Sequence, residues 1–98
     1  MQITREHILY KLATAKPMVI NQFGLKDMAL FGSFARNEVN AKSDIDIMID
    51  MNDKRFRIYC DLVDFLIGLF PGIEVQDVSR QAIKPAYFEH LKDDLLYV

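Results

Sequence analysis

Residues 31–36 read Phe-Gly-Ser-Phe-Ala-Arg, and residues 43–50 read Ser-Asp-Ile-Asp-Ile-Met-Ile-Asp. The second stretch alternates polar and apolar side chains with a period of two, which predicts a strand with its isoleucines on one face and its aspartates on the other. The first stretch follows a short apolar run at residues 27–31 that stops at Gly32, where a glycine permits a sharp turn. Together the two segments predict two strands, with a tight turn and a single helical turn after the first.

A helix is predicted ahead of these strands. Thr4 is a residue type that caps helix N-termini, and apolar residues then recur at helical spacing. Pro17 has no amide hydrogen, so it predicts either a kink or a division into two short helices. Gly24 suits the C-terminal cap of this segment.

A second helix is predicted after the aspartate-rich strand. Asn52-Asp53 should cap its start, and Pro71-Gly72 should end it about four turns later. Helical spacing predicts which side of this helix is buried. The lone cysteine, Cys60, lies on that side, so it is expected to be a small buried hydrophobe. That predicted side comprises Phe56, Cys60, Val63, Ile67 and Phe70, and it is widened by Leu62, Leu66 and Leu69, so the helix should be largely covered.

Residues 73–78 read as a third strand, and Lys84-Pro85 opens a last helix that continues to about residue 95. The predicted order is helix, strand, turn, strand, helix, strand, helix. This order predicts one α/β (α+β) domain over residues 1–98, with a small mixed β-sheet and helices packed on one face.

Charge and length narrow the classes of function. The 98 residues include 12 basic and 14 acidic side chains, a formal net charge of −2. This balance argues against non-specific nucleic-acid binding, which requires a basic surface. No signal peptide and no apolar run of membrane-spanning length is recognisable, so a cytoplasmic protein is expected. A chain this small should obtain a large substrate from a partner or from a second copy.

The acidic strand and the Gly-Ser turn suggest a site. Asp44 and Asp46 should point to the same face with Cα atoms about 6.6 Å apart, and paired carboxylates suit Mg²⁺ ions shared with substrate phosphates. Ser33 begins a helical turn whose free amides favour phosphate, and Arg36 follows one turn later. Each pattern alone also fits an ordinary half-exposed strand or turn, so the functional reading depends on their occurring together.

In combination, Leu30 to Arg36, Ser43 to Asp46 and Ala82 to Pro85 resemble the minimal nucleotidyltransferases of the DNA polymerase beta-like superfamily. The resemblance extends over essentially the whole chain and implies the nucleotidyltransferase fold. It implies that Gly32 and Ser33 bind the triphosphate of ATP and that Asp44 and Asp46 hold two Mg²⁺ ions. Arg36 and Ser43 would support nucleotide binding.

The family resemblance also implies a partner. Members are commonly antitoxins paired with a HEPN-type ribonuclease toxin, and active members transfer AMP from ATP to a tyrosine of that toxin. A less favoured alternative is a nucleotidyltransferase that acts on a small molecule. Such enzymes normally carry an additional acceptor-binding domain, which 98 residues cannot supply.

The chain departs from the family at the third carboxylate. Alignment of the ending places that position on Gln76, and an amide cannot act as a general base. Asp77 and Glu74 are the other candidates for this position. Asp77 has the strand parity of the core side, so it fits only if a bulge re-aims it or the alignment shifts by one residue, and Glu74 lies on the face of Gln76 but farther along the strand. The alternative is therefore a catalytically degenerate, nucleotide-binding antitoxin that neutralises its partner by binding alone. His90 is expected to be a surface histidine, Tyr87 a packing residue and Lys54 part of a solvated basic group.

Overall fold

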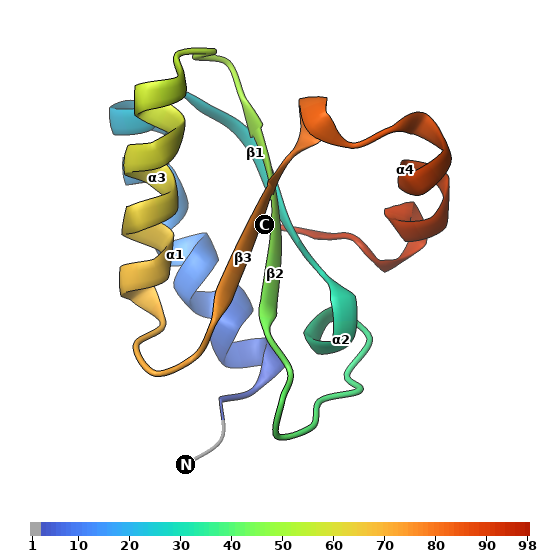
Figure 1. Ribbon diagram of the computed structural model, residues 1–98. Coiled ribbons are helices and arrows are strands. Elements are labelled where there is room, and N and C mark those ends of the chain that lie inside the picture. The colour runs from blue at the N-terminus through green and yellow to red at the C-terminus, as the bar shows by residue number, and fades with distance from the viewer. Residues whose placement is uncertain (1–2) are drawn as a thin grey trace.

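The structure is a computed structural model that describes residues 3–98. Its element order is the predicted one with three short additions, two 3₁₀ helices and a fourth strand (Figure 1). The elements are α1 (Arg5–Phe23), β1 (Leu25–Phe31), α2 (Gly32–Ala35), β2 (Ile45–Met51), α3 (Phe56–Leu69), β3 (Val75–Ser79), η1 (Arg80–Ala82), α4 (Pro85–Leu91), η2 (Lys92–Asp94) and β4 (Leu96–Tyr97).

Helix α1 confirms both predicted caps and excludes one of the two alternatives predicted at Pro17, a division into two short helices. The Thr4 hydroxyl accepts a hydrogen bond from the His7 amide at 3.1 Å, and Gly24 ends the helix with φ 69°. The helix is continuous through Pro17. Since Pro17 and Ala13 are both exposed, the Ala13 carbonyl that loses its helical partner can bond to water instead.

The four strands form a mixed sheet in the order β3-β2-β1-β4. β1 runs antiparallel to β2 and to β4, whereas β2 and β3 are parallel and are connected through α3. The register places Asp46 between Phe31 of β1 and Gln76 of β3. The next pair, Ile47 and Asp77, therefore points to the opposite face.

The main core lies between the sheet and helices α1 and α3, which cover the same face (Figure 1). The isoleucines of β2 are fully buried there, as predicted, together with Leu62 and Leu66 of α3. The prediction was wrong for Phe56, Cys60 and Ile67, which are exposed. α3 carries apolar residues on nearly every side, so contact with the sheet, rather than spacing, decides which side is buried.

The start of α3 also differs from the prediction. Arg55 precedes the first helical residue, and its side chain gives no cap hydrogen bond. Asp53 instead accepts the Arg55 amide at 3.0 Å, which forms a turn just before the helix.

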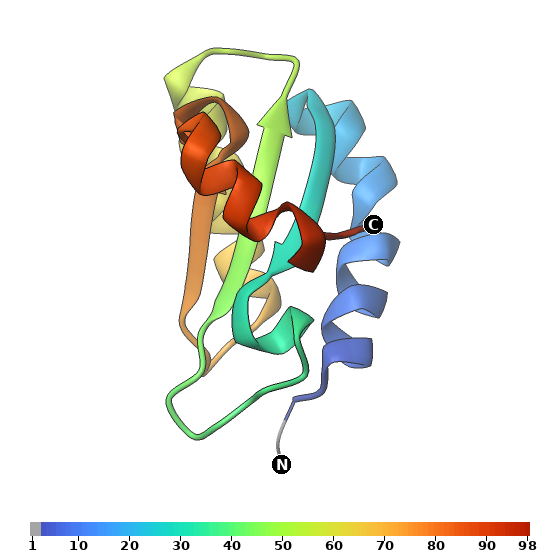
Figure 2. The ribbon, with the colours of Figure 1, turned by 90° about the vertical axis from the view of Figure 1, so that its right-hand side faces the viewer.

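A second, smaller core lies on the other face of the sheet. Ala29, Phe31 and Met48 pack there against Ile83 and Leu91 from the C-terminal segment. Figure 2 shows α4 in front of the sheet, with α1 behind it. The mixed sheet and the fold class are thus as predicted, and α1 and α3 share one face, but α4 additionally covers the opposite face. None of the helices in the described part of the chain is both long and apolar enough to cross a bilayer.

Candidate active site

Gly32 fixes the turn between β1 and α2. Its φ of 79° is in the left-handed region that disfavours side chains. A Cβ placed on Gly32 would lie 3.1 Å from the Asp46 Cγ and would collide with the Asp46 Oδ2. Only a glycine allows both the turn and the close approach of the Asp46 carboxylate to the backbone.

Ser33 lies in the single turn α2, and Arg36 follows as the C-terminal cap of this turn. The Arg36 amide donates to the Gly32 carbonyl at 3.1 Å, and the Glu38 amide donates to the Ser33 carbonyl at 2.8 Å. Asn37 leaves the turn with φ 59°, as expected of a residue type that tolerates this conformation.

The carboxylates of Asp44 and Asp46 lie where β2 begins, and both are half-buried. Burial raises the pKa of Asp46, the neighbouring Asp44 raises it further, and Arg36 opposes the change. Such a pair is stabilised by a cation placed between the two carboxylates, since a cation offsets their repulsion and their loss of hydration.

All six residues predicted to bind nucleotide or metal line one cavity of about 670 Å³. The volume is in the range of small-molecule sites. Several other lining residues were not predicted, and most of them come from the loop after α2 and from the C-terminal segment that contains α4 and η2. The lining comprises Phe31, Gly32, Ser33, Arg36, Asn40, Lys42, Ser43, Asp44, Asp46, Tyr87, His90, Leu91 and Asp94.

Two cationic side chains line this cavity, and they differ in whether they form ion pairs. Arg36 is held by Glu38 at 3.2 Å and by Asp94 at 3.4 Å, so it joins α2 to the C-terminal layer. Lys42 makes no ion pair with residues 3–98, but its turn is ordered because its amide donates to the Asn40 side chain at 2.8 Å. Lys42 therefore remains available to an anionic ligand.

Residues 15–97 match the family described as nucleotidyltransferase domain. The chain belongs to this family. A Methanocaldococcus jannaschii relative assigned as a protein adenylyltransferase is 38% identical over 85 residues, which span 85% of this chain and 86% of the relative. The protein adenylyltransferase MntA of Thermococcus cleftensis is 27% identical over 97 residues, covering 98% of this chain and 97% of its own.

A solved structure assigned as a minimal nucleotidyltransferase has the same fold. It superposes with a TM-score of 0.79 at 23% identity and covers 97% of this chain and 96% of its own. The family and the fold predicted from the sequence are therefore confirmed.

Gln76 lies on the active-site face of this nucleotidyltransferase domain. It is opposite Asp46 in the parallel register, and its Nε2 donates to the Asp44 Oδ2 at 3.1 Å. Glu74 is exposed, and its carbonyl accepts the Ile45 amide at 2.9 Å. Across residues 3–98, no three histidine, cysteine, aspartate or glutamate side chains gather as a metal-binding group. The donor set that fits Mg²⁺ here is thus two carboxylates, with the remaining positions left for water and phosphate oxygens.

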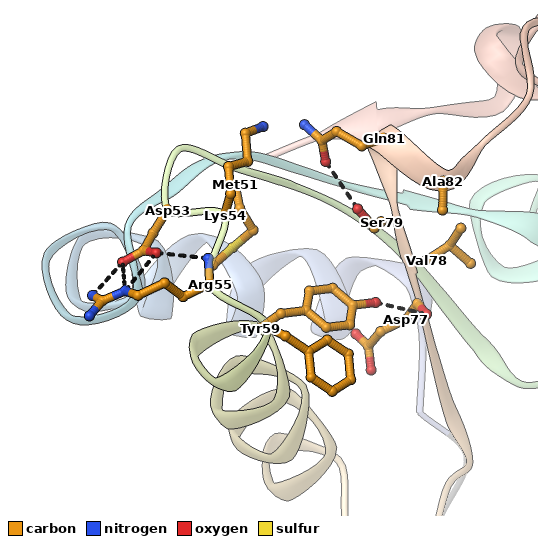
Figure 3. A pocket seen from close by; sticks show the side chains of 11 residues that line it. Met51, Asp53, Lys54, Arg55, Tyr59, Asp77, Val78, Ser79, Gln81 and Ala82 are labelled. Atoms are coloured by element: carbon orange, nitrogen blue, oxygen red, sulfur yellow. Dashed lines mark hydrogen bonds and ion pairs between the residues drawn. The ribbon is translucent and has the colours of Figure 1, made fainter.

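Asp77 lies in a separate cavity on the α3 face of the sheet, where both of its carboxyl oxygens are buried (Figure 3). Neither oxygen has a hydrogen-bond partner among residues 3–98. Burial raises the pKa of Asp77 from 3.8 to about 7. The strand parity predicted this orientation, so Asp77 is turned away from Asp44 and Asp46.

Replacing Asp77 with asparagine is expected to change how stability depends on pH. Between about pH 4 and pH 7 the folded protein keeps a proton on Asp77 that the unfolded chain has lost, so the free energy of unfolding falls as pH rises through this window. Asp77→Asn removes that decrease, which should stabilise the domain at about pH 8 by on the order of 2 kcal/mol after allowance for solvent screening.

Urea unfolding at several pH values would measure this dependence for Asp77→Asn. Asp64→Asn, at an exposed position on α3, is the control and should keep the pH dependence of the unchanged protein. Identical pH profiles for Asp77→Asn and the unchanged protein would contradict the prediction.

Proposed function

We propose that this domain transfers AMP from ATP to a hydroxyl group of a protein. The observation that carries the proposal is the pairing, in one cavity, of the Gly32 turn with the carboxylates of Asp44 and Asp46. The relatives described above are named as protein adenylyltransferases, and this supports the same chemistry.

Each residue has a role in the proposed transfer. Asp44 and Asp46 would hold Mg²⁺, which neutralises phosphate charge and activates the α-phosphate when bound. Ser33, Arg36 and Lys42 would bind the triphosphate, Arg36 through the guanidinium that Glu38 and Asp94 orient. Ser43 would brace the loop, because its hydroxyl accepts the Asn40 amide at 2.9 Å.

The bond changes define what the site must accomplish. The acceptor oxygen forms a bond to the α-phosphorus, the bond from that phosphorus to the bridging oxygen breaks, and pyrophosphate leaves with the electron pair. The acceptor proton must pass to a base. Gln76 cannot take it, whereas His90 lines the cavity and carries an imidazole, a side chain that can act as a general base.

The proposed acceptor is a tyrosine of a HEPN-type toxin, which would make this domain the antitoxin of a cytoplasmic toxin-antitoxin pair. The support is the family resemblance of the motifs around Gly32 and Asp44.

A second candidate function is neutralisation by binding alone. It is favoured by Gln76, whose amide donates to Asp44 where the family places a third carboxylate. In this case the domain binds nucleotide and occludes its partner without transferring AMP.

Mass spectrometry of a co-expressed HEPN partner tests the proposal. After incubation with the domain, ATP and Mg²⁺, the partner should gain the mass of one or more AMP units, and omission of Mg²⁺ should abolish the gain. An unchanged partner mass, with nucleotide binding retained, would instead establish the binding-only function.

Replacing Gln76 with aspartate is expected to raise the transfer rate, by roughly 10- to 100-fold, because it supplies a third carboxylate and a proton acceptor. Without Mg²⁺, three clustered carboxylates should repel one another and lower the melting temperature by a few degrees. Mg²⁺ should restore it.

Gln76→Asn is the matched control, since asparagine has the shape of aspartate without its charge. Transfer rates and melting curves with and without Mg²⁺ would measure both effects. If Gln76→Asp and Gln76→Asn behave alike, a carboxylate at residue 76 has no role.

A further inference from the structure

The second cavity, which contains Asp77, belongs to a different part of the domain from the active site. Its volume is about 470 Å³, and it shares no lining residue with the cavity at Asp44 and Asp46. It lies between the start of α3 and the end of β3 (Figure 3). Nothing in the proposed transfer of AMP uses it.

The floor of this cavity carries two hydrogen-bond acceptors without donors. Both oxygens of Asp77 lack a partner among residues 3–98, and burial raises the pKa of this carboxyl to about 7. A buried carboxyl without donors is costly, and two matched N–H groups would compensate it. Two other polar side chains of the lining are engaged with each other, since the Ser79 hydroxyl donates to Gln81 at 3.0 Å.

The walls of the cavity are aromatic and apolar. The rings of Phe56 and Tyr59 are stacked, with centroids 6.5 Å apart and an angle of 24° between their planes. Phe56 is 78% exposed, so its ring can adjust to a ligand without giving up much buried surface. A flat ring system stacks favourably on such side chains.

The rim of the cavity carries one cationic side chain that has no ion pair among residues 3–98. Arg55 is neutralised by Asp53, which it contacts at 2.7 Å, but Lys54 makes no ion pair with residues 3–98. A cationic ligand is therefore disfavoured at the rim, whereas an anionic group is favoured. The complementary ligand has a flat body, two adjacent N–H donors and a negative charge.

We propose that this cavity binds a guanine nucleotide, with the N1–H and 2-amino groups of the base donating to Asp77. The base stacks on Phe56 and Tyr59, and the phosphate lies near Lys54. Guanine presents two neighbouring donors to a carboxylate, whereas adenine presents an amino donor beside an acceptor. The domain would then have two nucleotide sites, one on each face of its sheet.

Fluorescence anisotropy with N-methylanthraniloyl-GMP tests this site. The protein carries Asp44→Asn and Asp46→Asn and is kept in EDTA, so that the active-site cavity contributes no metal-dependent binding. At about pH 8, where Asp77 is ionised, anisotropy should rise with protein, and unlabelled GMP should displace the probe. IMP, which lacks the 2-amino group, should bind about tenfold or more weakly, and AMP more weakly still.

Variants assign the binding to this cavity. On the same background, Asp77→Asn should weaken GMP binding by about tenfold or more, because its amide offers donors where the base also has donors. Phe56→Ser should weaken it severalfold, and Asp64→Asn, outside the cavity, should leave it unchanged. Melting curves confirm that each variant is folded.

Three results would overturn the proposal. They are no rise in anisotropy up to about 1 mM protein, equal affinities for GMP and AMP, and unchanged GMP binding in the folded Asp77→Asn variant. None of them bears on whether AMP is transferred at Asp44 and Asp46.

Discussion

Replacing Asp44 and Asp46 together with asparagine is expected to lower the rate of AMP transfer by about three orders of magnitude or more. The two carboxylates lie on the same face of the sheet at the start of β2, and each supplies a hard oxygen ligand that an asparagine replaces with a neutral one. The domain should stay folded, because Asp46 has a raised pKa and neither side chain forms an ion pair within residues 3–98.

Asp50→Asn is the matched control for this double variant. Asp50 lies on β2 with the same strand parity, but it accepts Gln81 Nε2 at 2.7 Å and is outside the cavity. Incorporation of radiolabelled AMP into the partner measures both proteins, and Asp50→Asn should retain activity. Transfer that persists in the double variant would mean that another site performs the chemistry.

Replacing Gly32 with alanine is expected to lower AMP transfer by about a hundredfold and to destabilise the fold by ~1–3 kcal/mol. Two causes act together. The φ of 79° disfavours a side chain, and the new Cβ would displace the Asp46 carboxylate from its place against the backbone. Urea unfolding and initial transfer rates measure the two effects separately.

Gly72→Ala separates backbone strain from the collision. Gly72 has φ 85°, yet a Cβ at this position meets nothing within 4 Å. This variant should lose about 1 kcal/mol of stability and keep its transfer rate. If Gly32→Ala behaves like Gly72→Ala, the contact with Asp46 has no functional importance.

The fold could be predicted at positions where a single type of side chain determines the local backbone conformation or its burial. Thr4 and Gly24 defined the ends of α1, and the isoleucines of β2 defined a buried strand face. Less was predictable for α3, because apolar residues surround it and only packing selects Leu62 and Leu66 over Phe56 and Ile67. The two residues of β4 are too few for a periodic pattern.

The second core was missed for a related reason. Met48 stands among the aspartates on the polar side of β2, and this apolar residue was the available sign that another layer covers that face. Once α4 is recognised there, Tyr87 and His90 follow as lining residues of the active-site cavity. His90 is exposed, as predicted, and Tyr87 is 55% exposed rather than packed; both line that cavity.

The pairing of Leu96 in β4 with Leu30 in β1 has a consequence for synthesis on the ribosome. The Gly32 turn and the carboxylates emerge early, but the wall that α4 contributes can pack only after the last of these segments has been made. At ~5–20 residues per second, residues 47–96 take several seconds to add. A nascent chain therefore carries its acidic pair for seconds before the wall from α4 is in place, so the proposed nucleotide site is complete only as translation of this domain finishes.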